Sequence, residues 1–188
     1  AQLPRRNISL PSSLLHAYFG ACLALAVMNL TLWTWLKDKL YLHCAAFLGV
    51  GVLYVQLRVW PDDQVVGHTT AGQLLGTAYA LHCVVATSFF SRLFEFRRNS
   101  VWSARFFVLV TWFNVIAMVL AMAGAYAPIS RAVVLMALVS TSFGSLFVLY
   151  QLLVKRRWQY LPAALAYAPQ VALGMLYMLR AQGLWPDW

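Results

Sequence analysis

Charge is the scarcest property of this sequence. Only 10% of its 188 residues are charged, and five of these are acidic. The sequence also contains no Gly-x-Ser-x-Gly motif, no His-Glu-x-x-His motif and no glycine-rich phosphate-binding loop, which are common signatures of hydrolases, zinc proteases and nucleotide-binding enzymes. No acidic residue falls in the middle of an apolar run, as a proton-coupled transporter would be expected to require. We therefore predict that the chain itself is not an enzyme.

Apolar residues make up most of the chain. The hydrophobic fraction is 62%, the aromatic fraction is 15% and the mean hydropathy is +0.70, which leaves too little polar surface for a water-soluble globule. A membrane-spanning helix needs on the order of 20 apolar residues. The sequence predicts an all-α, polytopic membrane bundle of six helices. Its spans are expected at about 14–36, 40–60, 73–95, 101–124, 128–154 and 159–181.

The 14 basic residues, which give a net charge of +9, sit in the short connections between these runs. This placement favours membrane topology over nucleic-acid binding as the reason for the charge. Alternate connections hold nine basic residues: Lys37, Lys39, Arg92, Arg97, Arg98, Arg105, Lys155, Arg156 and Arg157. The other side holds five: Arg5, Arg6, Arg58, Arg131 and Arg180. By the positive-inside rule, the N-terminus is predicted to lie outside the cytoplasm.

Residues 1–13 are predicted to form an extracytoplasmic connector, because two prolines and a basic pair precede the first apolar run. The sequence begins without an initiator Met or a signal peptide, so we expect a fragment of a larger protein. The three cysteines fall at different depths of their spans, which disfavours a disulfide or a metal site. We expect buried thiols without a chemical role.

The stretch Trp33-Thr34-Trp35-Leu36-Lys37-Asp38-Lys39 sets three charges between two apolar runs. We interpret it as a tight cytoplasmic turn, in which Lys37 and Lys39 orient the bundle and Asp38 caps the second helix. Further interface anchors are expected at Arg97, Arg98, Lys155, Arg156 and Arg157. The segment "FFSRLFEFRRNS" predicts that the third helix extends beyond the membrane into the headgroups. Residues 62–74, which include His68, are expected to form the longest external loop.

Polar residues inside the spans suggest where helices pack. Asn29 is expected to face another helix, because an unpaired amide in lipid is costly. Ser140 and Gly144 follow the small-xxx-small spacing of close helix packing, although hydroxyl groups there could also line a conduction path. Pro169 is expected to kink the sixth span.

The four histidines occur at different depths, and no two lie in one helix at a spacing that favours a shared ligand. We therefore predict no haem, metal or other cofactor.

Several of these features resemble the membrane region of the bacterial seven-transmembrane receptors with diverse intracellular signalling modules. "FFSRLFEFRR" is similar to the family's close of the third helix, and "GLWP" to its Gly-Leu-x-Pro after the sixth. The similarity extends over about residues 14–186. The other matching positions are Tyr18, Gly20, Met28, Asn29, Asp38, Tyr41, Leu42, Trp60 and Pro61.

The resemblance implies an upstream extracytoplasmic sensor domain, a seventh helix after residue 188, and a downstream cytoplasmic histidine kinase or diguanylate cyclase. We therefore expect a signal-transducing module that relays a stimulus across the membrane. A small oligomeric carrier or channel, with a wet path through Asn29, His82, Asn114 and Gln151, is the alternative, and a cofactor-binding membrane oxidoreductase is the third hypothesis. The oligomeric state stays open, with a homodimer as one option.

Overall fold

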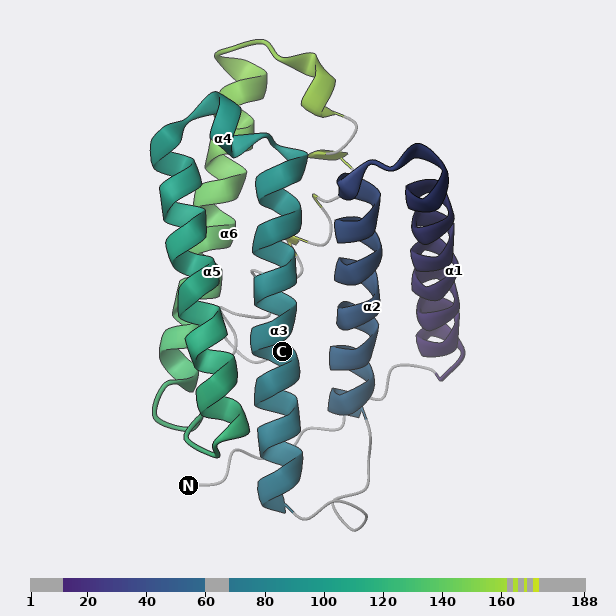
Figure 1. Cartoon of the computed structure of the whole chain (residues 1–188), viewed down its shortest axis with the longest axis vertical. Coiled ribbons are helices and arrows are strands. Elements are labelled where there is room, and N and C mark those ends of the chain that lie inside the picture. The colour runs from purple at the N-terminus through teal and green to yellow at the C-terminus, as the bar shows by residue number, and fades with distance from the viewer. Residues whose placement is uncertain (1–11, 60–67, 162–163, 166–167, 169–170, 173–188) are drawn as a thin grey trace.

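The fold of the chain is all-helical in a computed structural model that describes residues 12–59, 68–161, 164–165, 168 and 171–172 (Figure 1). The described residues contain no strand, which confirms the predicted fold class. The elements are α1 (Ser12–Leu36), α2 (Lys39–Val59), α3 (His68–Leu93), α4 (Phe96–Asn99), α5 (Val101–Met122), α6 (Ser130–Leu153) and a 3₁₀ turn η1 (Trp158–Tyr160).

Five of the described helices are long and apolar enough to cross a membrane: α1, α2, α3, α5 and α6. Large apolar side chains are exposed on every one of them, including Leu23, Leu53, Leu74, Leu109 and Leu146. In water such a surface would be unstable, whereas in a bilayer it contacts lipid. The chain is a multi-pass membrane protein.

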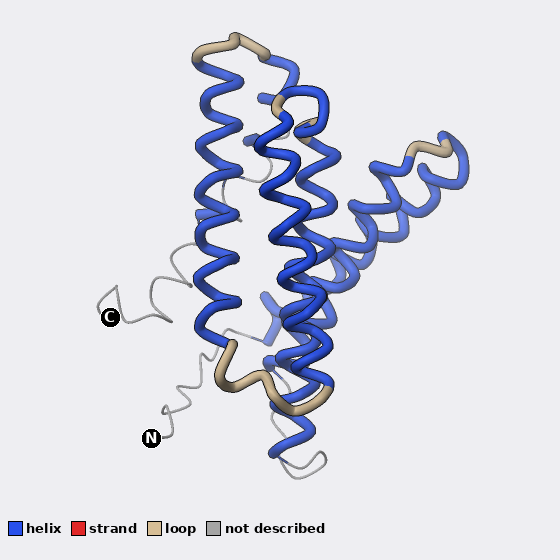
Figure 2. The backbone as a smooth tube through the Cα atoms, turned by 60° about the vertical axis from the view of Figure 1, so that its left-hand side comes forward, coloured by secondary structure: helices blue, strands red, loops and turns tan. Residues whose placement is uncertain are grey.

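The long helices run alternately up and down, and α3 occupies the centre of the described bundle (Figure 1). One side of α3 packs against α2 and the other against α5 and α6, while α1 packs against α2. Figure 2 shows the α1–α2 hairpin inclined to the other long helices. The hairpin therefore reaches the rest of the described bundle mainly through α3.

Small residues let α3 and α5 approach closely. Ala80 of α3, Ala117 of α5 and Val133 of α6 form one fully buried cluster. In the same interface, the hydroxyl groups of Thr87 and Thr111 lie 3.1 Å apart and form a hydrogen bond. Close backbone approach replaces the hydrophobic effect as the source of attraction between helices in lipid.

Aromatic rings build a second core where α3 ends. Phe94 and Phe96 are buried against Phe107 of α5 and Leu152 of α6. The rings of Phe96 and Phe107 stack with centroids 4.4 Å apart and an interplanar angle of 26°. Such a contact adds about 0.5–1.5 kcal/mol beyond the area that it buries.

The observed bounds correct two predictions for the third helix. Helix α3 begins at His68, five residues before the predicted position 73, so His68 is helical and the predicted external loop is shorter. Contrary to our prediction, the third helix also does not continue through the whole of the segment "FFSRLFEFRRNS". The helix ends at Leu93, Glu95 adopts a left-handed conformation (φ 47°), and the chain turns into α4. This turn buries Phe94 and Phe96, which a straight helix would leave on opposite sides.

The sixth predicted span, at 159–181, falls largely outside the described residues. The described positions within it from Leu161 onward are helical. The predicted connector at residues 1–13 also lies outside them, apart from Ser12 and Ser13, where α1 begins.

Candidate functional site

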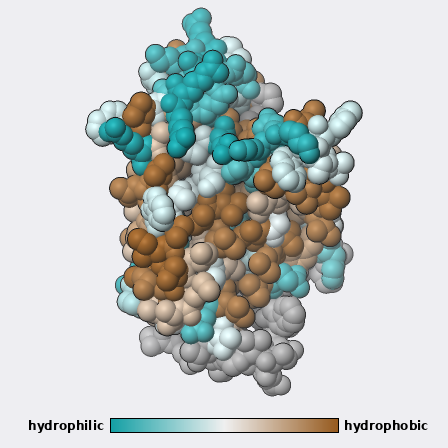
Figure 3. Space-filling view, in the orientation of Figure 1, coloured by the Kyte–Doolittle hydropathy of each residue, from teal (hydrophilic) through white to brown (hydrophobic). Residues whose placement is uncertain are grey.

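The basic residues gather at one end of the bundle, because α1, α3 and α6 end there and α2 and α5 begin there (Figure 1). We call this the basic end, defined by Lys37, Lys39, Arg92, Arg97, Arg98, Arg105, Lys155, Arg156 and Arg157. Figure 3 shows hydrophilic residues over this end and hydrophobic residues over the middle of the bundle. The grouping agrees with the charge count from the sequence. The direction in which this end faces stays a prediction.

Asp38 caps the second helix, as the sequence predicted. Its Oδ1 accepts a hydrogen bond of 2.9 Å from the backbone amide of Leu40, in the first turn of α2. On the other side of the turn, the Lys37 amide donates to the Trp33 carbonyl at 2.8 Å, and the Lys37 ammonium lies 5.9 Å from the Trp33 ring centroid. The turn is therefore fixed from both helices by local contacts.

A charged residue in a left-handed conformation follows each of the three long helices that end at the basic end. Lys37 follows α1 (φ 56°), Glu95 follows α3 (φ 47°) and Arg156 follows α6 (φ 52°). Glycine is the usual residue at such a position, because a Cβ there costs roughly 1–2 kcal/mol. The side chains offset part of that cost, since charged groups at these ends stay in the polar interface. At these positions the backbone conformation thus favours glycine, whereas the polar interface favours a charged side chain.

Asn99 joins three segments of the basic end. Its Nδ2 donates to the Phe94 carbonyl at 2.9 Å and to the Tyr160 hydroxyl at 3.0 Å. Its Oδ1 accepts a hydrogen bond from the Arg157 guanidinium. We call these contacts the Asn99 network. It ties the turn between α3 and α5 to the segment that follows α6.

A second contact joins the α1–α2 hairpin to α3. The Arg92 Nε donates to the His43 Nε2 at 3.0 Å, and the His43 Nδ1 lies 2.7 Å from the Lys39 carbonyl. Because a carbonyl only accepts and an arginine only donates, His43 must carry its proton on Nδ1. The contact joins α2 and α3 through a hydrogen bond between two side chains.

Other anchors have weaker contacts. The Arg98 guanidinium lies 3.5 Å from the Glu95 carboxylate on an exposed surface, and the Lys155 ammonium lies 5.9 Å from the Tyr150 ring centroid. Exposed pairs of this kind contribute at most about 1 kcal/mol. Arg97 is exposed and lies beside α5.

The alternative hypothesis of a carrier or channel predicts a water-filled path lined by four polar residues of the spans. Asn29 is buried but donates to the Leu25 carbonyl of its own helix at 2.8 Å. His82 stacks on Phe47 of α2, with ring centroids 5.2 Å apart. Asn114 and Gln151 are buried on α5 and α6. Among the described residues no hydrogen bond joins these four side chains. Three buried atoms form no hydrogen bond within the described part of the chain: His82 Nδ1, Asn114 Oδ1 and Gln151 Oε1.

The predicted packing positions Ser140 and Gly144 both lie on α6. Ser140 is buried, and its hydroxyl donates to the Ala137 carbonyl of its own helix at 3.0 Å. A Cβ at Gly144 would lie 3.4 Å from the Phe107 ring, so this glycine accommodates an aromatic side chain of α5. Small residues also meet between α3 and α5, at Ala80 and Ala117, and spacing within one helix could not identify this contact. Pro169 lies outside the described residues.

The turn between α5 and α6 closes the opposite end. Gly124 adopts φ 79°, and the Tyr126 ring lies against Gly76 of α3, where a Cβ would come within 2.8 Å of the ring. Burial, followed by proximity to Cys83, raises the pKa of Tyr126, so the phenol stays neutral. Glycine at position 76 is therefore required by the aromatic side chain that covers it.

No group of three or more His, Cys, Asp and Glu side chains comes together within the described part of the chain. Cys22, Cys44 and Cys83 form no disulfide bond within the described residues, and Cys22 and Cys83 are buried. Comparison of the chain with family models, with curated proteins and with solved structures finds no match.

Proposed function

We propose that the chain is a transmembrane signal-transducing module of the bacterial inner membrane, with its N-terminus outside the cytoplasm. In this proposal it relays an extracytoplasmic stimulus, received by an upstream sensor domain, to a downstream histidine kinase or diguanylate cyclase in the cytoplasm. Two features support it: the charge asymmetry between the two ends, and the resemblance of the turn at Asp38 and of "FFSRLFEFRR" to the receptor family.

The central position of α3 is the observation that carries the proposal. This helix runs from the end opposite the basic end to the basic end, and it packs against α2, α5 and α6. A displacement of α3 along its axis must therefore change its packing against three neighbours at once. Packed interfaces of this kind switch between discrete arrangements instead of deforming continuously.

The basic end provides a route from α3 to the following part of the chain. Helix α3 leads into Phe94 and Phe96, which pack against α5 and α6, and into Asn99, which binds Tyr160 and Arg157 after α6. A shift of α3 would move the start of the segment that continues toward the expected output domain. The Asn99 network is thus the proposed point of coupling.

The first test is the complete reading frame of the gene. A kinase or cyclase domain encoded after the membrane region supports the proposal, and its absence would refute it.

The second test measures signal-dependent output of the full-length protein in membranes. Replacement of Asn99 by Ala should uncouple output from the stimulus, as should the combined replacement of Ser140, Gly144 and Pro169 by Leu. Gly49→Leu is the matched control, because no atom lies within 4 Å of a Cβ at that exposed position. Unchanged signal dependence in both test variants would refute the relay.

The three unpaired polar atoms of His82, Asn114 and Gln151 favour one alternative, a small oligomeric carrier or channel. Buried polar atoms without partners are sites where water or a polar solute can bind. Solute flux into liposomes that contain only this chain, reduced by Asn114→Leu, would support this alternative over the relay.

A further inference from the structure

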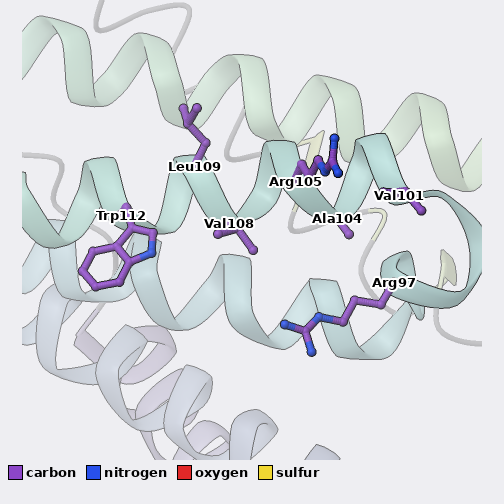
Figure 4. A pocket seen from close by; sticks show the side chains of 7 residues that line it. All are labelled: Arg97, Val101, Ala104, Arg105, Val108, Leu109 and Trp112. Carbon is purple, nitrogen blue, oxygen red and sulfur yellow. The ribbon is translucent and has the colours of Figure 1, made fainter.

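A groove of about 630 Å³ opens on the lipid-facing side of α5 at the basic end. It combines a charged mouth with an apolar wall. Its lining residues are Arg97, Val101, Ala104, Arg105, Val108, Leu109 and Trp112. Figure 4 shows Arg97 on the edge of the groove formed by Ala104 and Val108, and Arg105 and Leu109 on the opposite edge, so that the two arginines flank the groove.

The two arginines at the mouth carry uncompensated charge. Neither Arg97 nor Arg105 forms an ion pair within the described part of the chain. The nearby Glu95 carboxylate is instead engaged with Arg98, at 3.5 Å. Arg105 stacks over the Trp102 ring, 5.8 Å from its centroid, which holds the guanidinium at the interface without neutralising it. The groove contains no acidic lining residue, so it favours an anion.

The wall of the groove consists of exposed apolar side chains. Val101, Leu109 and Trp112 are 60%, 61% and 64% exposed, respectively. Leu109 and Trp112 follow Arg105 along α5, whereas Val101 precedes it. Seven residues of helix correspond to about 10 Å of depth between Arg105 and Trp112. The hydrocarbon half of a bilayer is about 15 Å deep, so the wall lies where acyl chains lie when the arginines are at headgroup level.

We propose that this groove binds one anionic diacyl phospholipid, with its phosphate at Arg97 and Arg105 and an acyl chain along Val108, Leu109 and Trp112. Charge complementarity selects the headgroup, because two guanidinium groups can donate several hydrogen bonds to phosphate oxygens. The apolar wall selects a molecule with a hydrocarbon chain over a free anion. The site does not depend on the proposed relay, and it could exist equally in a carrier.

The test uses the full chain, purified in a neutral detergent, and native mass spectrometry with titrated dioleoyl phosphatidylglycerol or dioleoyl phosphatidylcholine. The native protein should retain one phosphatidylglycerol at lower concentration than one phosphatidylcholine. Arg97→Gln with Arg105→Gln should weaken phosphatidylglycerol binding by about thirtyfold, the size expected for two basic side chains near an anionic headgroup. Binding of phosphatidylcholine should change by less than about twofold, because its headgroup is neutral overall.

The matched control is Lys39→Gln with Lys155→Gln, which removes the same charge at the same end but outside the groove. It should change phosphatidylglycerol binding by less than about twofold, because the Coulomb interaction with distant exposed charges is screened. A second test variant, Val108→Trp, keeps both arginines and fills the wall, and it should weaken binding as well.

An equal loss in the control pair would show that surface charge alone attracts the lipid and would overturn the site. Equal retention of the two lipids by the native protein would also overturn it. A dimer that is lost in the Arg97 and Arg105 variant, with no bound lipid, would assign the groove to a second copy of the chain instead.

Discussion

Replacement of Asn99 by Ala removes the side chain that ties the turn after α3 to the segment after α6. Two lost hydrogen bonds, to the Phe94 carbonyl and to the buried Tyr160 hydroxyl, should cost about 0.5–1.5 kcal/mol each. The bond with the exposed Arg157 guanidinium adds little, because solvent screens it. The expected loss in the free energy of unfolding is therefore about 2 kcal/mol.

The buried thiols of Cys22 and Cys83 provide the assay, since they react with a thiol-sensitive dye only when the bundle opens. Unfolding in micelles should be followed by dye reaction and by helical circular dichroism. Asn99→Asp is informative, because its carboxylate can still accept from Arg157 and from the Tyr160 hydroxyl but cannot donate to the Phe94 carbonyl. It should therefore lose less stability than Asn99→Ala. The control is Arg98→Ala, which changes an exposed neighbour and should have an effect of less than about 0.5 kcal/mol.

A double-mutant cycle with Tyr160→Phe makes the reasoning refutable. If Asn99 and Tyr160 interact directly, the losses of unfolding free energy in the two single variants must not be additive. Their sum must exceed the loss in the double variant by about 0.5–1 kcal/mol. Fully additive effects, or an Asn99→Ala variant as stable as the native protein, would show that the network does not hold the basic end together.

Three further predictions concern local geometry. Asp38→Ala should lower the free energy of unfolding by about 1 kcal/mol through loss of the helix cap, whereas Asp38→Ser should restore most of it in the same unfolding assay. Arg156→Gly should stabilise the chain by about 1 kcal/mol, because position 156 has φ 52° and glycine adopts this conformation without strain. The control Lys155→Gly, at a position without a positive φ, should not stabilise the chain. Equal effects of the two substitutions would contradict the role of the left-handed conformation. Gly144→Leu should destabilise by about 1–3 kcal/mol against the Phe107 ring while Gly49→Leu should not, and a tolerated Gly144→Leu would mean that α6 does not pack there.

The spans were predictable from the sequence because bilayer thickness fixes the length of an apolar run. Four predicted spans agree with the observed helices to within two residues at each end, from α1 at Ser12–Leu36 to α6 at Ser130–Leu153. The start of α3 was not predictable in this way. Hydropathy locates the hydrocarbon boundary, and polar residues such as His68, Thr69 and Thr70 can continue a helix beyond it.

The functional residues divide according to the range of their contacts. The cap at Asp38 was predictable, because its partner is the amide two residues ahead. The role of Asn99 was not, because its partners Tyr160 and Arg157 lie 61 and 58 residues away. The turn at Glu95 carried no glycine or proline signal, since burial of the flanking phenylalanines determines it. Prediction from sequence pattern fails where a side chain distant in the sequence stabilises the local conformation.

The basic residues of the basic end thereby fall into two physical groups. Arg92 donates to His43 of another helix, whereas the Lys39 ammonium has no hydrogen-bond or ion-pair partner within the described residues. Topology depends on the number of basic residues beside the spans and not on their contacts. Arg92→Gln and Lys39→Gln should therefore shift the orientation reported by alkaline phosphatase fusions equally. Only Arg92→Gln should also loosen the α1–α2 hairpin from α3, and this would appear as faster dye reaction at Cys22. If Lys39→Gln exposed Cys22 equally, the charge at this end would act on stability as a whole, and the His43 contact would have no separate role.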